Sequence, residues 1–254
     1  MALRYLILSD IHGNLEAFRA VLAHARRKRR DRILFLGDAV GYGASPNQVV
    51  ETLRSLGRSL VAVRGNHDRA ALDPERETAL FNQHARDAAL WTARTLTAAN
   101  RRFLASLPQG PREVAKDLVI SHGSPADEDE YLFSEIEASM AFQASGCPVV
   151  LFGHSHVPCM FEYSQGPDGP HILASLMRGP RVVADLDQER RYLLNPGSVG
   201  QPRDRDPRAS YGMYDSKAKR FTLYRVPYDL ESTRRRIVAA GLPGILGDRL
   251  QRGA

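Results

Sequence analysis

The stretch that decides the fold is YLILSDIHGN, residues 5–14. Its first four residues form a short apolar run that is typical of a buried strand. Polar side chains follow at once, among them Asp10 and His12, and Asn14 can cap a helix whose apolar residues recur at helical spacing. Ligands bind beyond the carboxyl ends of the strands in open α/β sheets, so this stretch predicts a strand, two site residues and a helix in that order.

The same arrangement recurs along the first 156 residues. Four further apolar runs end in polar turns that contain glycine: Gly37-Asp38, Gly65-Asn66-His67-Asp68, Ser121-His122-Gly123 and Gly153-His154-Ser155-His156. The alternation of apolar runs with helical spacing predicts a parallel sheet that is covered by helices, with strands at 5–8, 33–36 and 60–63. Residues 69–108 show only helical spacing, and two more strands are expected at 117–121 and 148–152.

Beyond His156 the pattern changes to short strands separated by Gly, Pro and Asp turns, which predicts a second, more antiparallel sheet. A last helix is expected to begin at Asp229 and to end at Gly241. We therefore expect a single α/β domain over residues 1–254, built as a sandwich of two sheets with outer helices. The helical insert at about 69–108 is expected to form a wall of the pocket.

Composition and charge limit the class of protein. The chain has 254 residues, of which 43% are hydrophobic and 25% charged, and this excludes a disordered, collagen-like or coiled-coil protein. Its two cysteines, Cys147 and Cys159, form no CxxC pair, so a disulfide scaffold and a thiolate zinc cluster are not expected. They are interpreted as free thiols in a reducing compartment.

No apolar run reaches the roughly 18 residues of a membrane-spanning helix, and the N-terminus lacks the features of a secretory signal. The expected location is the cytoplasm. The formal net charge of +6 favours anionic partners without naming one. Two basic runs, 26–30 and 234–236, lack interleaved aromatic residues, so they are interpreted as solvated helix faces and not as a nucleic-acid patch.

Five of the eight histidines lie directly after predicted strands. Each of these motifs alone is a weak signal, but together they place aspartates, an asparagine and histidines at one edge of one predicted sheet. Buried charge is costly there unless metal ions compensate it. The i, i+2 spacing of Asp10 with His12, and of His154 with His156, points both side chains of a pair to one side if the strand continues through them. The pattern therefore predicts a metal site.

These motifs resemble those of the calcineurin-like metallophosphoesterases, in particular their small bacterial phosphodiesterase branch. The matching segments are residues 9–14, 37–41, 65–68, 121–123, 153–156 and a later segment, 195–203. The resemblance implies a two-sheet fold with its metal site at the C-terminal strand ends. It also implies two ligand sets, of which the first is Asp10, His12, Asp38 and His156. The second is Asp38, Asn66, His122 and His154, so that Asp38 would bridge the two ions.

The resemblance further implies that His67 is the general acid or a phosphate-facing group, and that Asp68 orients it. The residues by themselves equally allow Asp68 to be a turn residue or a helix cap. Nitrogen and oxygen ligands without thiolate suit Mn, Fe, Co, Ni or Zn better than Ca. Two such ions at about 3.5–4 Å can generate a bridging hydroxide and stabilise charge on the attacking and leaving oxygens.

The leading hypothesis is thus a two-metal hydrolase of small phosphate esters, most of all a phosphodiesterase. The alternatives are a phosphomonoesterase or protein phosphatase, a dinucleoside-polyphosphate hydrolase, a nuclease, and a non-catalytic scaffold on the same fold. A scaffold commonly loses ligands, whereas every ligand position is filled here.

Arginine side chains are the expected contacts to substrate phosphate because the guanidinium group matches phosphate bidentately. Four arginines near the motifs are candidates for this role: Arg64, Arg69, Arg203 and Arg208. Salt bridges or plain solvation are the alternative for each of them. The acidic run at 127–130 is expected at the N-terminus of a helix, and an extra cation site is the alternative.

Overall fold

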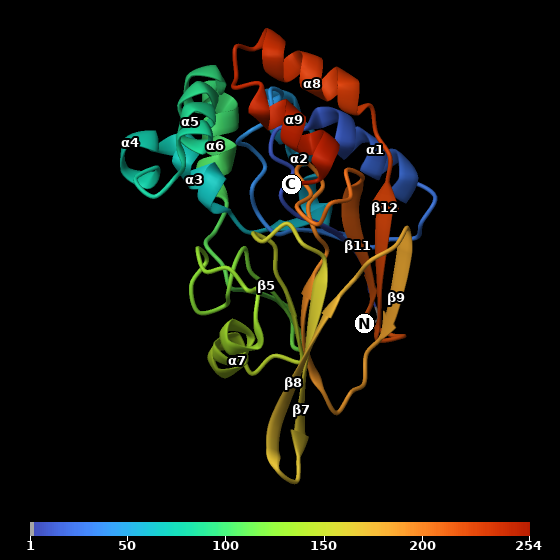
Figure 1. The fold of residues 1–254 in the computed structure, drawn as a ribbon. Helices are drawn as coiled ribbons and strands as arrows, with labels where there is room; N and C mark the ends of the chain where they lie inside the picture. Colours follow the sequence, from blue (N-terminus) through green and yellow to red (C-terminus); the bar gives the residue numbers. More distant parts are fainter. Residues whose placement is uncertain (1–2) are drawn as a thin grey trace.

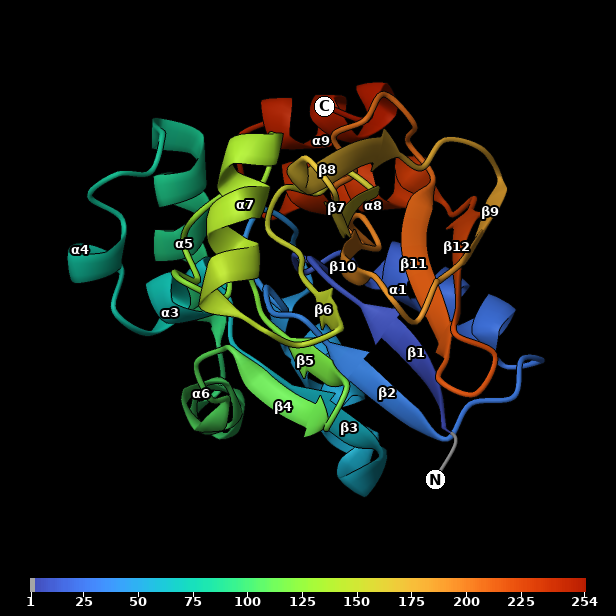
Figure 2. The same ribbon diagram turned by 90° about the horizontal axis from the view of Figure 1, so that it is seen from below.

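The computed structural model describes residues 3–254 and contains two mixed six-stranded sheets with helices packed outside them (Figures 1 and 2). The first sheet has the strand order β3-β2-β1-β11-β12-β9. Its strands are β1 (Arg4–Leu8), β2 (Arg32–Phe35), β3 (Leu60–Ala62), β9 (Arg181–Asp185), β11 (Ala209–Asp215) and β12 (Arg220–Val226). The second sheet has the order β4-β5-β6-β10-β7-β8. Its strands are β4 (Arg112–Ala115), β5 (Leu118–Ile120), β6 (Val149–Leu151), β7 (Cys159–Gly166), β8 (Gly169–Leu176) and β10 (Arg191–Asn195).

The helices lie along the outer faces and over one end of the sheets, and the β7–β8 hairpin extends from the opposite end (Figure 1). In chain order they are α1 (Leu15–Ala25), α2 (Pro46–Ser55), the 3₁₀ turn η1 (Gly57–Ser59), α3 (Asn66–Leu72), α4 (Pro74–Glu77), α5 (Gln83–Thr95), α6 (Ala98–Ser106), α7 (Glu135–Ala144), α8 (Leu230–Ala239) and α9 (Ile245–Arg252). None of the described helices is long and apolar enough to span a membrane.

Strand β1 shows why the two sheets pack as a sandwich. Successive side chains of a strand point to opposite faces. Leu6 and Leu8 join the core beneath α1, while Ile7 joins the core between the two sheets. Leu194 of β10 lies in that same inner core with no exposed surface. Both faces of the central strands are therefore buried, which explains their continuous apolar runs.

The structure corrects the expected division of strands between the sheets. The strands after residue 156 do not form a sheet of their own, because β9, β11 and β12 complete the first sheet and β7, β8 and β10 complete the second. Strands β5 and β6 also belong to the second sheet and do not extend the parallel set of β1, β2 and β3. An apolar run shows that a strand is buried, but its neighbour is chosen by tertiary packing.

Three elements were missed by the sequence analysis: β4, α7 and α9. Helix α7 begins after Ser134, whose side chain accepts a hydrogen bond from the Ile136 N–H, so the acidic run at 127–130 lies in a loop and not at a helix N-terminus. Helix α9 follows Pro243 and continues the chain beyond the expected end of the last helix. The other expectations for this part hold, since Asp229 caps α8 and residues 69–108 contain helices only, within the described chain.

The second basic run lies on helix α8 and both cysteines are free, as the sequence predicts, but the first run lies in the turn after α1 and not on a helix face. Residues 26–30 follow the end of α1, while in the second run Arg234 pairs with Asp248 at 3.1 Å and Arg236 with Glu16 at 2.7 Å. Cys147 and Cys159 are both free thiols.

Leu194→Ala should lower the free energy of unfolding by about 2–5 kcal/mol, because it leaves a cavity in the core between the sheets. Leu173→Ala is the matched control, since Leu173 on β8 is 58% exposed, and it should cost about 0.5 kcal/mol or less. Urea unfolding followed by circular dichroism measures both. Equal effects of the two substitutions would contradict the packing described here.

Candidate metal centre

Seven polar residues from five loops meet at one end of the molecule. The loops follow β1, β2 and β3 of the first sheet and β5 and β6 of the second. They contribute Asp10, His12, Asp38, Asn66, His122, His154 and His156. The site therefore lies where the C-terminal strand ends of two sheets meet, and not at one edge of one sheet as expected. The sequence could not predict this position, because an apolar run does not show to which sheet its strand belongs.

The backbone at these residues is strained. Five of them, namely Asp10, His12, Asp38, His154 and His156, have left-handed φ values between 51° and 65°. For residues with a Cβ this conformation costs roughly 1–2 kcal/mol each. The expectation that an extended strand sets the direction of the i, i+2 pairs is thus wrong, because tight turns set it instead. Strain gathered on the polar residues of one site is a feature of functional sites.

Glycines allow the loops to approach these side chains. A Cβ at Gly65 would collide with the Asp38 carboxylate, and a Cβ at Gly153 would collide with the Ser9 hydroxyl. The loop after β3 therefore lies directly against Asp38, and the loop after β6 directly against the loop after β1.

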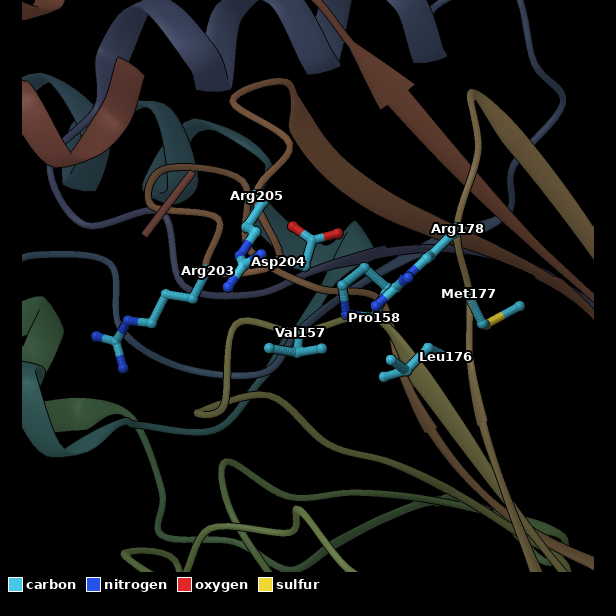
Figure 3. Close-up of a pocket in the computed structure, with 8 residues that line it drawn as sticks. All are labelled: Val157, Pro158, Leu176, Met177, Arg178, Arg203, Asp204 and Arg205. Atoms are coloured by element: carbon cyan, nitrogen blue, oxygen red, sulfur yellow. The ribbon is translucent and has the colours of Figure 1, made fainter. Parts of the chain in front are cut away.

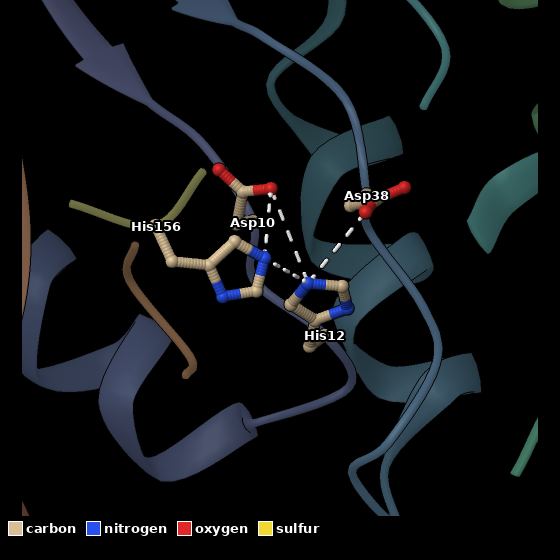
Figure 4. A group of neighbouring side chains, drawn as sticks. All are labelled: Asp10, His12, Asp38 and His156. Carbon is tan, nitrogen blue, oxygen red and sulfur yellow. Dashed lines mark hydrogen bonds and ion pairs between the residues drawn. The ribbon is translucent and has the colours of Figure 1, made fainter. Parts of the chain in front are cut away.

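The first group of ligands consists of Asp10, His12, Asp38 and His156, each of which places one ligand atom within 4.8 Å of the others (Figure 4). The Nδ1 atom of His12 donates to the Val40 carbonyl at 3.0 Å, and that of His156 donates to the Gln201 carbonyl at 2.6 Å. These bonds leave the two Nε2 lone pairs facing each other at 3.1 Å. Two acceptors at this distance repel unless a cation or a proton lies between them.

The second group consists of Asp38, His122 and His154, with the Asn66 side chain beside it. His122 Nδ1 donates to the Leu36 carbonyl at 2.8 Å, which leaves Nε2 at 3.0 Å from Asn66 Oδ1 and 3.5 Å from Asp38 Oδ2. His154 donates through Nε2 to the Asp129 carbonyl at 3.0 Å, so its Nδ1 is the free ligand atom. Backbone carbonyls thus orient the rings of all four histidines and fix which ring nitrogen faces the centre, which is typical of metal ligands.

Asp38 belongs to both groups, and its carboxylate is fully buried. Oδ1 accepts a hydrogen bond from the His67 backbone N–H at 2.9 Å. Oδ2 has no hydrogen-bond partner among the described residues. A buried carboxylate oxygen without a partner is costly, and it is explained if a cation completes its contacts. The residues present therefore fit a bound metal.

Burial and mutual repulsion shape the charges of the centre. Burial, assisted by the nearby Asp38 carboxylate, raises the pKa of Asp10 to about 7. Burial lowers the pKa of His154 to about 3 and holds those of His12 and His156 well below the ordinary value. These three imidazoles are consequently neutral at pH 7 and keep the lone pairs that a metal requires.

Asp38 and His122 show the opposite shifts. Burial alone would raise the pKa of Asp38, but the surrounding histidines hold it well below its ordinary value. Burial likewise opposes a charge on His122, yet Asp38 and Asp10 raise its pKa to about 10. A proton on His122 therefore supplies positive charge beside Asp38, in the position where a cation would supply it.

His67 lies beside the two groups and is buried among aromatic rings. Its ring centroid is 4.5 Å from that of Tyr42, 4.7 Å from that of Phe81 and 4.9 Å from that of His12. Its Nδ1 atom is buried and has no hydrogen-bond partner among the described residues. Burial lowers the pKa of His67 to about 4, so the ring is neutral at pH 7 and one nitrogen remains available to a ligand.

The structure gives Asp68 a different task from the one that the resemblance implied. Its carboxylate accepts hydrogen bonds from four backbone N–H groups: those of Asp38 at 2.9 Å, Ala39 at 2.9 Å, Gly65 at 3.1 Å and Val40 at 3.3 Å. In the described part of the chain no hydrogen bond joins it to His67. Asp68 therefore ties the loop after β2 to the start of α3, as in the alternative of a cap.

Three of the four candidate arginines are bound to carboxylates. Arg64 lies 3.0 Å from Glu128, and Arg69 pairs with Glu77 at 2.9 Å and with Asp129 at 2.7 Å. Arg208 makes a bidentate pair with Asp206, with contacts at 2.9 and 2.6 Å. These contacts correspond to the salt-bridge alternative.

Arg203 differs from the other three. It has no carboxylate partner among the described residues, and its Nε is buried without a hydrogen bond. Its guanidinium carbon lies 6.0 Å from the centroid of the Tyr42 ring, which in turn packs on His12 at 4.8 Å. Its backbone N–H donates to the His156 carbonyl at 3.3 Å. Arg203 is therefore an unpaired cation at the edge of the centre.

The sequence analysis missed two aromatic residues of the site. Tyr131 stacks on His154 with centroids 3.8 Å apart, and Phe81 packs on His67. Both line a cavity of about 390 Å³ beside Asn66 and His154. Neither residue lies in a recognisable motif, and the carbonyls that orient the histidines leave no signal because every residue carries one.

Comparison with known proteins gives a consistent picture. Residues 3–219 match the model of the calcineurin-like phosphoesterase superfamily domain. An uncharacterized protein of Methanocaldococcus jannaschii is 37% identical over 248 residues, which are 96% of this chain and 96% of that protein. The phosphodiesterase YfcE of Escherichia coli (strain K12) is 26% identical over 222 residues, 84% of this chain and 88% of that protein.

Among solved structures, a metallophosphoesterase from Sphaerobacter thermophilus has a TM-score of 0.84 at 39% identity and covers 100% of both chains. A hypothetical protein from Pyrococcus horikoshii OT3 shares the fold with a TM-score of 0.78 at 19% identity, over 99% of this chain and 98% of that one. The expected two-sheet α/β fold is confirmed.

Asp68→Asn should lower the free energy of unfolding by about 1–3 kcal/mol, because an amide NH₂ in place of one oxygen leaves buried N–H groups without an acceptor. Asp168→Asn, in the exposed β7–β8 turn, is the matched control and should have little effect. Urea unfolding measures both. Wild-type stability combined with loss of hydrolysis would show instead that Asp68 acts through His67.

Proposed function

The chain belongs to the calcineurin-like phosphoesterase superfamily and is a metal-dependent phosphoesterase, and on this premise we propose that it hydrolyses phosphodiesters of small molecules with two divalent transition-metal ions. The observation that carries the proposal is the position of Asp38. Its buried carboxylate is common to two groups of ligand atoms, and one of its oxygens has no protein partner in the described chain. One ion would leave one of the two groups uncompensated.

We assign the ions to the two groups as the motifs suggest. Asp10, His12, Asp38 and His156 would hold one ion, and Asp38, Asn66, His122 and His154 the other. The nitrogen and oxygen donors suit Mn, Fe, Co, Ni or Zn. When bound, such ions supply Lewis acidity, which activates water as a nucleophile near neutral pH and neutralises charge on the phosphoryl oxygens.

The protein's own groups bind and orient the substrate. Arg203 at the edge of the centre has no carboxylate partner in the described chain, and its Nη2 donates to Gln201 Oε1 at 3.2 Å. Its guanidinium group can therefore take phosphoryl oxygens. The His67 ring lies 4.9 Å from the His12 ring, which places it beside the first ligand group, within reach of a phosphate ester bound there. In the role of acid it would transfer a proton to the leaving oxygen, and the negative charge of the bound phosphate would favour the protonated ring.

The preference for diesters is supported by the likeness to the phosphodiesterase YfcE. The catalytic reading is supported against a scaffold, because all ligand positions are occupied by residues that can bind metal. Arg64, Arg69 and Arg208 contribute little to substrate binding in this proposal, since their charges are already neutralised.

Asp38→Asn should reduce bound metal and phosphodiester hydrolysis together, because the neutral amide removes the charge that both ions share. Elemental analysis of the purified protein and an assay with bis(p-nitrophenyl) phosphate measure the two quantities. Asp168→Asn again serves as the control. Retention of two metals and of wild-type activity in Asp38→Asn would exclude a bridging role.

If His67 donates the proton, His67→Ala should retain the metals. It should hydrolyse esters with weakly acidic leaving groups about 10²–10⁴-fold more slowly than the wild type. The loss should shrink for esters with very acidic leaving groups, which depart without a proton. His84→Ala on the exposed side of α5 is the matched control. The measurement is kcat for a series of leaving groups in each variant, and an equal loss across the series would assign His67 to binding instead.

A further inference from the structure

A cavity of about 540 Å³ lies beside the loop that carries His156 (Figure 3). Its walls are Val157 and Pro158, the end of β8 with the chain that follows it at 176–178, and the loop at 203–205. The cavity and the metal centre share a border, because Val157 directly follows His156 and the backbone of Arg203 is hydrogen-bonded to the His156 carbonyl. Of the residues that were given a role above, only Arg203 lines this cavity.

Positive charge dominates the cavity lining. Arg178, Arg203 and Arg205 line it, and no ion pair joins any of them to a carboxylate within residues 3–254. The one acidic residue of the lining, Asp204, is bound by the buried guanidinium of Arg225. The neighbouring Asp206 is paired with Arg208. Two arginines and two aspartates thus cancel, and three arginines remain.

The three free arginines form a path that leads away from the metal centre. Figure 3 shows the side chain of Arg178 extending toward Pro158 and that of Arg205 lying beside Asp204, while the side chain of Arg203 extends away from both. On that side Arg203 reaches Tyr42, which packs on both His12 and His67. One cation is therefore placed at the centre and two are placed across the cavity.

The backbone of Arg205 shows that this placement is built into the fold. Its φ of 66° is left-handed, which costs roughly 1–2 kcal/mol for a residue with a Cβ. Its N–H donates to the Gly253 carbonyl at 2.8 Å, just after α9. The end of α9 thus holds the loop in the conformation that directs Arg205 into the cavity.

A second cavity beside the centre has a different character. The 390 Å³ cavity beside Asn66 and His154 is lined by two arginines and two acidic residues, so its formal charge is zero. Of these two cavities at the centre, only the one beside His156 therefore offers surplus positive charge to an anion.

We propose that the cavity beside His156 binds a second anionic group of the substrate, a phosphate linked to the one that reacts. The proposal rests on the function proposed above and narrows its substrate class to small molecules with at least two phosphates, such as nucleotides that carry a phosphate besides the hydrolysed diester. Arg203 would contact the reacting phosphate, and Arg178 with Arg205 would contact the second one through charge-assisted hydrogen bonds.

Two substrates with the same leaving group test this. Thymidine 5′-(p-nitrophenyl phosphate) has the reacting diester alone, and its 3′-phosphorylated form adds a second phosphate. The wild type should prefer the 3′-phosphorylated form by about tenfold or more in kcat/KM, since hydrogen bonds to charged groups contribute about 1.5–3 kcal/mol. In the double variant Arg178→Gln, Arg205→Gln this ratio should fall toward one.

The double variant Arg27→Gln, Arg29→Gln is the control for overall charge, because it also removes two exposed arginines, here from the run after α1. It should keep the wild-type ratio. A ratio that is the same in the cavity variant as in the wild type would overturn the proposal. An equal fall in both double variants would also overturn it, because the preference would then reflect only long-range charge.

Calorimetric binding separates this proposal from the proposed function, because it needs no hydrolysis. Thymidine 3′,5′-bisphosphate should bind more tightly than thymidine 5′-phosphate, and the cavity variant should lose that difference. If the protein shows this difference in affinity but hydrolyses neither p-nitrophenyl ester, the proposed function is refuted and the anion site is retained.

A short single-stranded oligodeoxynucleotide is the third ligand. If it alone bound more tightly to the wild type than to the cavity variant, the assignment to small molecules would be wrong.

Discussion

The buried carboxylate of Asp38 is the group on which the rest of this site depends. Its backbone carbonyl accepts hydrogen bonds from the N–H groups of Ile11 and His12 at 2.8 and 3.0 Å, and its own N–H is held by Asp68. Its side chain accepts from the N–H of His67. The loops after the first three strands are therefore joined at one residue. Its remaining oxygen, Oδ2, has no hydrogen-bond partner among the described residues, and a cation held where these loops converge would complete its contacts.

A site of this kind opposes the stability of the fold. Buried carboxylates, neutral imidazoles with facing lone pairs and left-handed residues each cost free energy when no metal is bound. The inner core between the sheets and the cores beneath the helices supply the rigidity that keeps these groups together. Because a metal binds the assembled site and not the unfolded chain, metal binding would stabilise the folded state and offset part of this cost.

The arginines around the centre differ in whether a carboxylate neutralises them. Beside α3 and the acidic loop, carboxylates neutralise Arg64 and Arg69. These two arginines therefore offer no surplus positive charge to a substrate. On the side of His156, Arg178, Arg203 and Arg205 form no ion pair with a carboxylate in the described chain. In the binding mode that we propose, the arginines without a carboxylate partner select the substrate.

The sequence by itself determined the two-sheet α/β class, the helical segment at 69–108 and the residues that the structure brings together in the two ligand groups. These features are local, since an apolar run, a capping residue and a polar turn can each be read without knowing what packs against them. The motifs resemble those of the calcineurin-like phosphoesterases, the family to which the chain belongs.

Only the tertiary structure decided which sheet each strand joins and that Asp68 accepts hydrogen bonds from backbone amides. It also decided which arginines are neutralised: Arg203 has no carboxylate partner in the described chain, whereas the other three candidates, Arg64, Arg69 and Arg208, have one. It also brought Tyr131 onto His154 and the end of α9 against Arg205. The physical reason is the same for all of these: strand neighbours, hydrogen-bond partners and ion pairs join residues far apart in the chain, and many partners are chemically equivalent until packing selects one.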